Sequence, residues 1–284
     1  MGQLIDGKHV ASEMRAVIRT EAAQLFESTG KKPKLTVVIL GENPASQSYV
    51  RSKKKSAADV GFDSDVIELP AQTTESDLLS LIEKLNDDGD VHGILVQLPL
   101  PDHIDEQAVI RKISIEKDVD GFHPEQVGGL SIGLDVLEPC TPSGIIALLD
   151  FYDIDVAGMN AVIVGRSNIV GKPIANMLLK KDATVTIAHS RTKNLADVTR
   201  QADLVVVAIG RPHFLTADMV KEGVVVVDVG INRTDEGKLV GDIDFVDVEK
   251  KASYITPVPG GVGPMTITML LSNTLKAYKK SLGL

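Results

Sequence analysis

The amino-acid sequence has few of the features that mark secreted, membrane-embedded or nucleic-acid-binding proteins. It contains one cysteine, Cys140, so no disulfide can form within the chain, which suits a reducing compartment. No apolar run approaches the ~20 residues that a membrane-spanning helix needs. The N-terminal Met1–Lys8 has neither an apolar signal core nor arginine-rich transit character. From these features we expect a cytoplasmic protein. The net charge of −9 argues against nucleic acid or an anionic membrane as the main partner.

What the sequence does contain is a regular alternation of helix and strand patterns. Hydrophobic residues make up 43% of the 284 residues, enough for a large core, and this length is typical of two domains. Apolar spacing and turn residues predict helices near 9–30, 46–60, 76–85 and 265–281, strands near 35–40, 65–69, 93–98, 161–165, 183–188, 203–209 and 224–229, and a hairpin or loop at Thr234–Asp242. Thr74 is suited to cap the N-terminus of the helix predicted near 76–85. We expect an α/β fold with mostly parallel sheets, and a domain boundary at the Pro- and Gly-rich segment Pro139–Gly144.

A strand runs into a glycine loop and then a helix at Ala161–Pro173. Such a turn directs backbone N–H groups at one point, which suits a phosphate. The pattern is not a Walker loop, because five residues separate Gly165 from Gly171 and Pro173 replaces the magnesium-binding hydroxyl. Nor is it Gly-x-Gly-x-x-Gly, because Ser167 replaces the second glycine. A variant dinucleotide loop and a tight turn with packing glycines both remain open.

The end of the next predicted strand favours NADP over NAD. In NAD-binding folds an acidic residue about 20 positions on binds the ribose 2′-hydroxyl, whereas Ile187–Arg191 contains no carboxylate. Ser190 and Arg191 suit a 2′-phosphate instead, because arginine offers a planar fork to phosphate oxygens. Arg166 in the loop adds a second cation. The alternative is that Arg191 is a solvated loop charge.

Tyr49 and Lys53 share one face of a predicted helix at i and i+4. They can do proton chemistry if the pKa of Lys53 falls from its usual value near 10.4, through burial or through the cationic neighbours Arg51, Lys54 and Lys55. The alternative is a solvated basic face. Tyr-x-x-x-Lys is also typical of short-chain dehydrogenases, but there it follows the nucleotide loop, whereas here it precedes that loop by over a hundred residues.

Two other segments carry polar groups where strands end or turns form. Gln97 lies within an otherwise apolar predicted strand, as a satisfied core group or as a hydrogen-bonding arm at the strand's carboxyl end. The carboxylates of Asp118 and Asp120 could bind an amino-heterocycle, cap a helix or shape a turn. We expect no metal site, because the spacing of His123 and these aspartates matches no metal-ligand set.

Taken together, these segments resemble the bifunctional methylenetetrahydrofolate dehydrogenase/cyclohydrolase family. The segments that carry the resemblance span nearly the whole chain in order: Tyr49–Lys53, Val96–Pro101, Lys117–Pro124, Pro139–Gly144, Gly165–Gly171 and Pro257–Thr266. The resemblance implies NADP-dependent oxidation of 5,10-methylenetetrahydrofolate and hydrolysis of the methenyl product to 10-formyltetrahydrofolate. It also implies a homodimer. Two rival interpretations are a monofunctional NAD-dependent member of the family and a dinucleotide sensor without catalysis.

The resemblance also implies roles for particular residues. Lys53 would be the general acid/base of the cyclohydrolase, with Tyr49 orienting the folate, Gln97 hydrogen-bonded to Lys53 and Asp120 on the pterin. The other residues implied on the folate side are Val96, Leu98, Pro259, Gly260, Gly261, Val262 and Gly263. On the NADP side, Gly165, Arg166 and Ser167 would contact phosphates and ribose, Ser190 and Arg191 the 2′-phosphate, and Ile231 the nicotinamide.

The implied architecture is a folate-binding catalytic domain over 1–139 and a Rossmann-like NADP domain over 140–264. The active-site cleft would lie between them, and the helix at 265–284 would pack back on the first domain. The glutamate tail of folate, polyglutamylated or not, is anionic, and the basic helix face at Lys54 and Lys55 is its expected contact.

Overall fold

The computed structural model describes residues 2–234 and 236–284, and these form two compact units. One unit contains Glu13–Cys140 and Ile267–Leu284, and we call it the three-stranded unit after its sheet. The other contains the residues up to Ser12 together with Thr141–Thr266, and we call it the six-stranded unit. The chain therefore does not divide only near residue 140, because both ends of the sequence also change unit.

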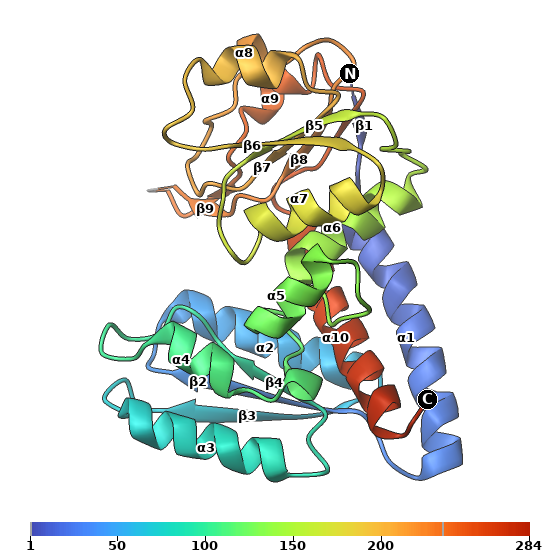
Figure 1. The fold of residues 1–284 in the computed structure, drawn as a ribbon, viewed down its shortest axis with the longest axis vertical. Helices are drawn as coiled ribbons and strands as arrows, with labels where there is room; N and C mark the ends of the chain where they lie inside the picture. The colour runs from blue at the N-terminus through green and yellow to red at the C-terminus, as the bar shows by residue number, and fades with distance from the viewer. Residues whose placement is uncertain (1, 235) are drawn as a thin grey trace. The chain divides into compact units, whose positions relative to one another are not determined.

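The three-stranded unit is built on a parallel sheet in the order β3-β2-β4 (Figure 1). Its strands are β2 (Lys34–Leu40), β3 (Asp63–Leu69) and β4 (Gly93–Val96). Strand β2 is buried along nearly its whole length, as its continuous apolar sequence predicts for a central strand covered on both faces.

Successive residues of β2 point to opposite faces, and each face has its own core. Val38 and Leu40 pack with buried residues of α3 (Glu75–Asp87) and α4 (Glu106–Lys112). On the other face Leu35 and Val37 pack with α1 (Gly7–Thr29), α2 (Pro44–Asp59) and α10 (Val262–Ser281). The predicted cap is present, since the Thr74 side chain accepts from the backbone N–H of Asp77 at the start of α3.

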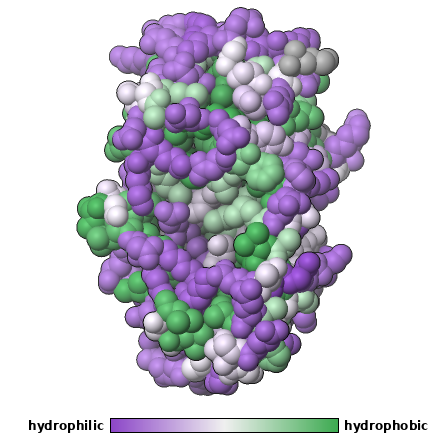
Figure 2. Space-filling view, turned by 90° about the vertical axis from the view of Figure 1, so that its right-hand side faces the viewer, coloured by the Kyte–Doolittle hydropathy of each residue, from purple (hydrophilic) through white to green (hydrophobic). Residues whose placement is uncertain are grey.

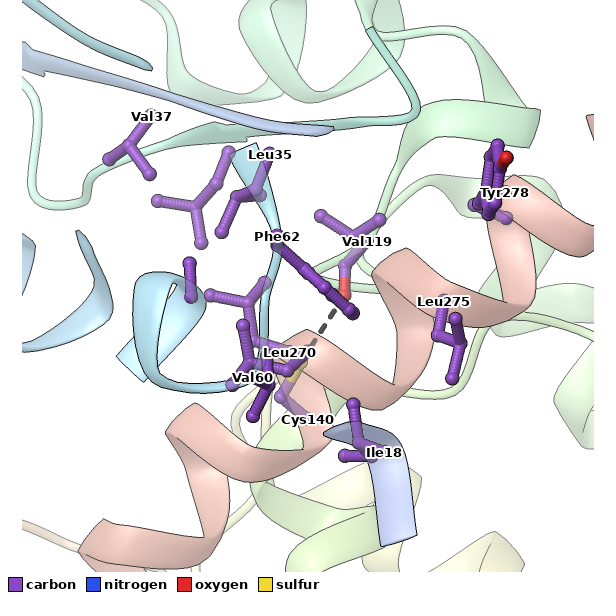
Figure 3. Close-up of a cluster of buried hydrophobic side chains, with 14 of the residues drawn as sticks. Ile18, Leu35, Val37, Val60, Phe62, Val119, Cys140, Leu270, Leu275 and Tyr278 are labelled. Carbon is purple, nitrogen blue, oxygen red and sulfur yellow. Dashed lines mark hydrogen bonds between the residues drawn. The ribbon is translucent and has the colours of Figure 1, made fainter. Parts of the chain in front are cut away.

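Figure 3 shows how this second core brings together residues from distant parts of the sequence. Tyr278 of α10 is fully buried, and its hydroxyl is satisfied by Thr29 Oγ1 at 2.8 Å and the Lys31 carbonyl at 2.9 Å. Cys140 is also buried, and its Sγ donates to the Val119 carbonyl at 3.2 Å. Cys140 is therefore a packed, hydrogen-bonded thiol of the core.

The six-stranded unit is a parallel sheet in the order β1-β11-β8-β7-β5-β6. Its strands are β1 (Gln3–Leu4), β5 (Asn160–Val164), β6 (Thr184–Ala188), β7 (Leu204–Val207), β8 (Val225–Asp228) and β11 (Tyr254–Ile255). The chain moves from β5 to β6 on one side and then to β7 on the other. This reversal is a topological switch point, where α/β sheets bind ligands at the carboxyl ends of their strands.

Several elements differ from the sequence-based expectation. Strand β4 ends at Val96, and Gln97 makes the last ladder bond, from its N–H to the Val38 carbonyl at 2.8 Å. Pairing stops there because Pro99 has no N–H to donate. Helix α10 begins at Val262, three residues before the predicted start, since Pro264 is tolerated in a first helical turn.

The division between the two units falls between Cys140 and Thr141, within the predicted boundary segment Pro139–Gly144, and α6 (Cys140–Phe151) begins there. The first twelve residues belong to the six-stranded unit because β1 pairs with β11. The predicted hairpin is present as β9 (Asn232–Arg233) paired antiparallel with β10 (Leu239–Val240). Position 235 in its loop lies outside the described residues.

The face that Figure 2 presents is mostly hydrophilic, with separate apolar patches. Within the described parts of the chain, no helix is both long enough and apolar enough to cross a membrane.

Candidate active site

In the three-stranded unit a buried lysine is held by a glutamine. Lys53 lies on α2 with 8% of its surface exposed, and its Nζ donates to Gln97 Oε1 at 3.0 Å. The other end of the amide is also used, since Gln97 Nε2 donates to the Leu98 carbonyl at 2.8 Å. That second bond fixes the orientation of the amide, so its oxygen faces the ammonium group. Gln97 is thus the hydrogen-bonding arm at the carboxyl end of β4.

Burial tunes both ionisable groups of this cluster toward their neutral forms. Burial lowers the pKa of Lys53, and the charge of Asp120 partly opposes that shift. Burial likewise raises the pKa of Asp120, against the stabilising charge of Lys53. These opposite shifts bring the pKa of the amine and the pKa of the carboxyl group closer together than those of solvated groups, which favours proton exchange.

The cationic neighbours are not the cause of the lowered Lys53 pKa. Arg51, Lys54 and Lys55 are all exposed, and burial is the cause of the shift. The solvated basic face therefore exists on α2, but Lys53 is not part of it. Tyr49, one turn before Lys53, is 40% exposed and lies nearer the surface.

The two aspartates of the 118–124 segment have different partners. Asp118 is buried, accepts the His123 N–H at 2.7 Å and shapes the turn before α5 (Pro124–Ser131). Burial raises the pKa of Asp118 to about 7. Asp120 instead interacts with Lys53, and it lines a small cavity of about 10 Å³ with Val96 and Leu98.

Sequence reasoning missed the residue that holds this segment. Asn273 of α10 is buried, and its Nδ2 donates to the Val119 carbonyl at 2.9 Å and the Glu138 carbonyl at 2.8 Å. A lone amide on the apolar face of the last helix was the available signal. Through Asn273, α10 anchors both the Asp118–Asp120 turn and the chain entering Cys140.

In the six-stranded unit the glycine loop connects β5 to α7 (Gly171–Lys180). A Cβ on Gly165, whose φ is +133°, would lie 2.4 Å from the Ala208 carbonyl oxygen, and a Cβ on Gly171 would lie 2.4 Å from the Gly165 oxygen. Both glycines are required by close backbone approach. Ser167 has its own role, because its Oγ accepts from the N–H groups of Val170 and Gly171, both at 3.2 Å. The residues between them, Arg166 to Ile169, are exposed.

Ser190 and Arg191 follow β6, the neighbour of β5, and both are exposed. The Arg191 N–H donates to His189 Nδ1 at 3.1 Å, which fixes the backbone but leaves the guanidinium outside the bond. Within the described residues, neither Arg166 nor Arg191 forms an ion pair. The glycine loop and this pair of cations therefore fit an anionic, phosphate-bearing ligand at the switch point.

Ile231 follows β8 with 46% of its surface exposed, and a Cβ on Gly263 would lie 3.5 Å from Ile231 Cδ1. Gly263 belongs to the Pro259–Gly263 turn, in which Gly260 adopts φ +111° and its carbonyl accepts the Lys8 N–H at 3.2 Å. The structure thus brings Lys53, Gln97 and Asp120 together in the three-stranded unit. It places all the cofactor-side residues and the Pro259–Gly263 turn in the six-stranded unit.

Among the residues that the structure describes, no cluster of three or more His, Cys, Asp or Glu side chains could hold a metal ion. The chemistry available is that of a buried amine, an amide, a carboxyl group and a phosphate-binding loop.

A Lys–Gln–Asp cluster at the end of one parallel sheet and a dinucleotide-type loop at the end of another define a two-unit α/β nucleotide-dependent enzyme. Residues 5–120 match the catalytic-domain model of tetrahydrofolate dehydrogenase/cyclohydrolase, and residues 139–282 match its NAD(P)-binding-domain model. The chain therefore belongs to the tetrahydrofolate dehydrogenase/cyclohydrolase family.

Individual relatives are similar to this chain over nearly its full length. The bifunctional protein FolD of Streptococcus gordonii is 56% identical over 282 residues, covering 99% of each chain. The crystal structure of the bifunctional enzyme FolD from Campylobacter jejuni is 53% identical with a TM-score of 0.97, covering 99% of each chain. The structure of the Trypanosoma brucei enzyme, complexed with NADP cofactor and inhibitor, is 41% identical with a TM-score of 0.96 and covers 100% of this chain and 99% of that one.

These matches confirm the predicted family and the α/β fold class with its catalytic and nucleotide-binding parts. They also confirm the predicted enzyme class, a dehydrogenase and cyclohydrolase of tetrahydrofolate that uses a nicotinamide dinucleotide. The roles of the individual site residues stay predictions.

Proposed function

We propose that this protein oxidises 5,10-methylenetetrahydrofolate with NADP and hydrolyses the methenyl product to 10-formyltetrahydrofolate, with Lys53 as the general acid/base of the hydrolysis. The observation that carries the proposal is the buried Lys53 ammonium, hydrogen-bonded to Gln97 at 3.0 Å and facing Asp120, with its pKa lowered by burial. A lysine with an ordinary pKa is almost entirely protonated at pH 7 and is a poor base.

The hydrolysis needs two proton transfers that one amine can serve. Water adds to the methenyl carbon, one carbon–nitrogen bond breaks, and one proton is released overall. Lys53 Nζ takes a proton from the attacking water and returns one to the departing nitrogen. Gln97 keeps Nζ in place, and Asp120 binds the pterin ring.

The oxidation needs positioning rather than protons from the chain. NADP, when bound, accepts hydride from the folate methylene carbon. The chain holds the dinucleotide through the exposed loop Arg166–Ile169 and through Ser190 and Arg191, whose charge and hydroxyl suit the 2′-phosphate. Ile231 would contact the nicotinamide. The presence of NADP in the similar Trypanosoma brucei structure supports this cofactor choice.

We further propose that folate binds on the three-stranded unit, within residues 1–139, and that NADP binds on the six-stranded unit, within residues 140–264. The C-terminal helix belongs to the three-stranded unit from Ile267 on. The Pro259–Gly263 turn contributes from the cofactor side. The single buried thiol and the acidic net charge support a cytoplasmic location.

One spectrophotometric assay tests the proposal. With methylenetetrahydrofolate and NADP, absorbance of NADPH and methenyltetrahydrofolate should rise together, and the methenyl signal should then decay faster than it does without enzyme. NADPH formation without accelerated decay would identify a monofunctional dehydrogenase, and dinucleotide binding without turnover would identify a sensor.

The exposed lysines of α2 are expected to bind the glutamate tail of folate. Lys54→Glu with Lys55→Glu should raise the KM for a polyglutamylated substrate about 10-fold and leave the KM for the monoglutamate within about twofold, because only the longer tail carries the extra charges. Initial rates with both substrates measure this. Lys84→Glu, on helix α3 against the other sheet face, is the control. Unchanged affinity for polyglutamate in the double variant would contradict the contact.

We also propose a homodimer that uses the edge of the six-stranded sheet at β6. Leu179 at the end of α7 is 61% exposed, and Thr184, Thr186 and Ile187 of this edge strand are exposed as well. An exposed edge strand flanked by apolar side chains such as Leu179 and Ile187 is normally covered. Sedimentation equilibrium should give twice the mass of the chain, and Leu179→Glu should shift the equilibrium toward monomer. A wild-type monomer at micromolar concentration would contradict this proposal.

A further inference from the structure

Two aspartates to which the sequence assigns no site role lie buried in the six-stranded unit, at the carboxyl ends of its central strands. Asp228 is the last residue of β8, and Asp242 follows β10; the chain returns Asp242 to the end of β8, where its N–H bonds the Asp228 carboxylate. Burial of a carboxylate is costly unless every oxygen is satisfied. Both of these carboxylates are satisfied by backbone N–H groups.

The Asp228 carboxylate hydrogen-bonds the backbone on both sides of Asp242 and in its own segment. Asp228 Oδ1 accepts the N–H of Gly230 and of Asp242, both at 2.9 Å, and its Oδ2 accepts the N–H of Ile243 at 3.0 Å. A Cβ on Gly241 would lie 1.8 Å from Asp228 Oδ2, so the carboxylate rests directly on that glycine.

Asp242 holds the loops that follow the neighbouring strands. Its Oδ2 accepts the N–H of Ile209 at 2.7 Å and of Gly210 at 2.9 Å, after β7. Its Oδ1 accepts a hydrogen bond from the N–H of Arg211 at 2.7 Å, also after β7. The same oxygen accepts a second bond from Asn232 Nδ2 at 2.9 Å, after β8. A Cβ on Gly230 would lie 2.2 Å from that same Oδ1.

The segments held this way border the switch point. Strand β7 pairs with β5, and a Cβ on Gly165 of the glycine loop would lie 3.6 Å from Ile209 Cγ2. Ile231 stands between Gly230 and Asn232, two residues that the carboxylates bond. Asp228 and Asp242 therefore fix the backbone under both the glycine loop and Ile231, while their own side chains stay buried.

We infer that Asp228 and Asp242 are positioning residues of the dinucleotide site, which hold segments 209–211 and 230–232 in the conformation that receives the nicotinamide half of the cofactor. This inference rests on the function proposed above. A carboxylate is required at 242 because all four partners are N–H donors, and the amide of an asparagine would direct two hydrogens at donors.

The charge state supports the assignment. Burial, together with the charge of Asp242, raises the pKa of Asp228 to about 7, and the three backbone N–H groups oppose that rise. A purely structural contact could be made by neutral side chains, without the free-energy cost of burying a carboxylate.

The experiment compares Asp242→Asn with wild type as full-length proteins. NADPH fluorescence should show the Kd raised about 10-fold, since hydrogen bonds to a charged group are lost, and the dehydrogenase KM for NADP should rise in parallel. Cyclohydrolase activity, assayed with methenyltetrahydrofolate and no cofactor, should stay within about twofold of wild type, because Lys53 lies in the other unit. The matched control is Asp203→Asn, whose carboxylate accepts the Asn160 N–H at 2.8 Å at the amino ends of the same sheet and should leave NADPH binding unchanged.

Equal loss of both activities, or an unchanged Kd for NADPH, would overturn the inference in favour of a purely structural brace. A wild-type protein that binds no NADPH would overturn the proposed function itself. If Asp242→Asn does not fold, Asn232→Ala removes one donor to Oδ1 and leaves every backbone bond. That variant should raise the Kd for NADPH about threefold, and an unchanged Kd there would overturn the inference equally.

Discussion

Lys53→Met will lower the cyclohydrolase activity by about 10³-fold, because general acid–base catalysis contributes of that order and methionine carries no proton. The dehydrogenase will retain much of its activity, since hydride transfer requires no proton from this residue. Methionine is close to lysine in length and suits the apolar surroundings of a side chain that is 8% exposed, so the fold should survive. The two activities are measured separately, by decay of methenyltetrahydrofolate and by formation of NADPH.

The control for Lys53→Met is Arg51→Met, an exposed position on the same helix, which should change neither activity. The pH profile adds an independent test. Lys53 accepts a proton only when neutral, and burial lowers its pKa, so the hydrolysis rate should rise with pH through a midpoint below 10.5. That rising limb should be missing from the variant. Equal loss of both activities would contradict the assigned role.

Local signals in the sequence were sufficient for the elements with strong periodicity. Strand β2 was predicted because a central parallel strand needs an unbroken apolar run, and the start of α3 because Thr74 bonds the Asp77 N–H. Strands β1 and β11 have two residues each, too few to show a period. Strand β1 could not be predicted, because it forms only by pairing with β11, some 250 residues away in the sequence.

The candidate site shows the same division between local and distant causes. Tyr49 and Lys53 could be paired by helical spacing, and Gln97 stood out as a polar group beside an apolar strand. The reason for the lowered Lys53 pKa could not be read locally, since burial of a side chain depends on tertiary packing, and the neighbouring cations proved to be exposed. Asn273, Asp228 and Asp242 were missed because each acts on backbone groups that only the folded chain brings near.

Arg191→Ala is expected to raise the KM for NADP about 100-fold and to leave the KM for NAD within about twofold. The guanidinium contributes charge-assisted hydrogen bonds to a 2′-phosphate, worth about 1.5–3 kcal/mol with further loss of long-range attraction, whereas NAD has only a hydroxyl at that position. Because Arg191 is exposed and forms no ion pair among the described residues, its removal leaves no buried group unsatisfied and should not alter stability. Initial rates with the two cofactors give the ratio directly.

Two further variants separate the shape of this contact from its charge. Arg191→Lys keeps the positive charge but loses the planar fork, so the KM for NADP should rise about 10-fold, between wild type and the alanine variant. Lys193→Ala removes an exposed charge two residues away and should change the KM by less than about threefold, since a surface charge without a defined geometry is largely screened. If all three substitutions shifted NADP and NAD alike, the 2′-phosphate contact would have to be reassigned. Selectivity would then have to come from another exposed cation at this switch point, such as Arg166 in the glycine loop.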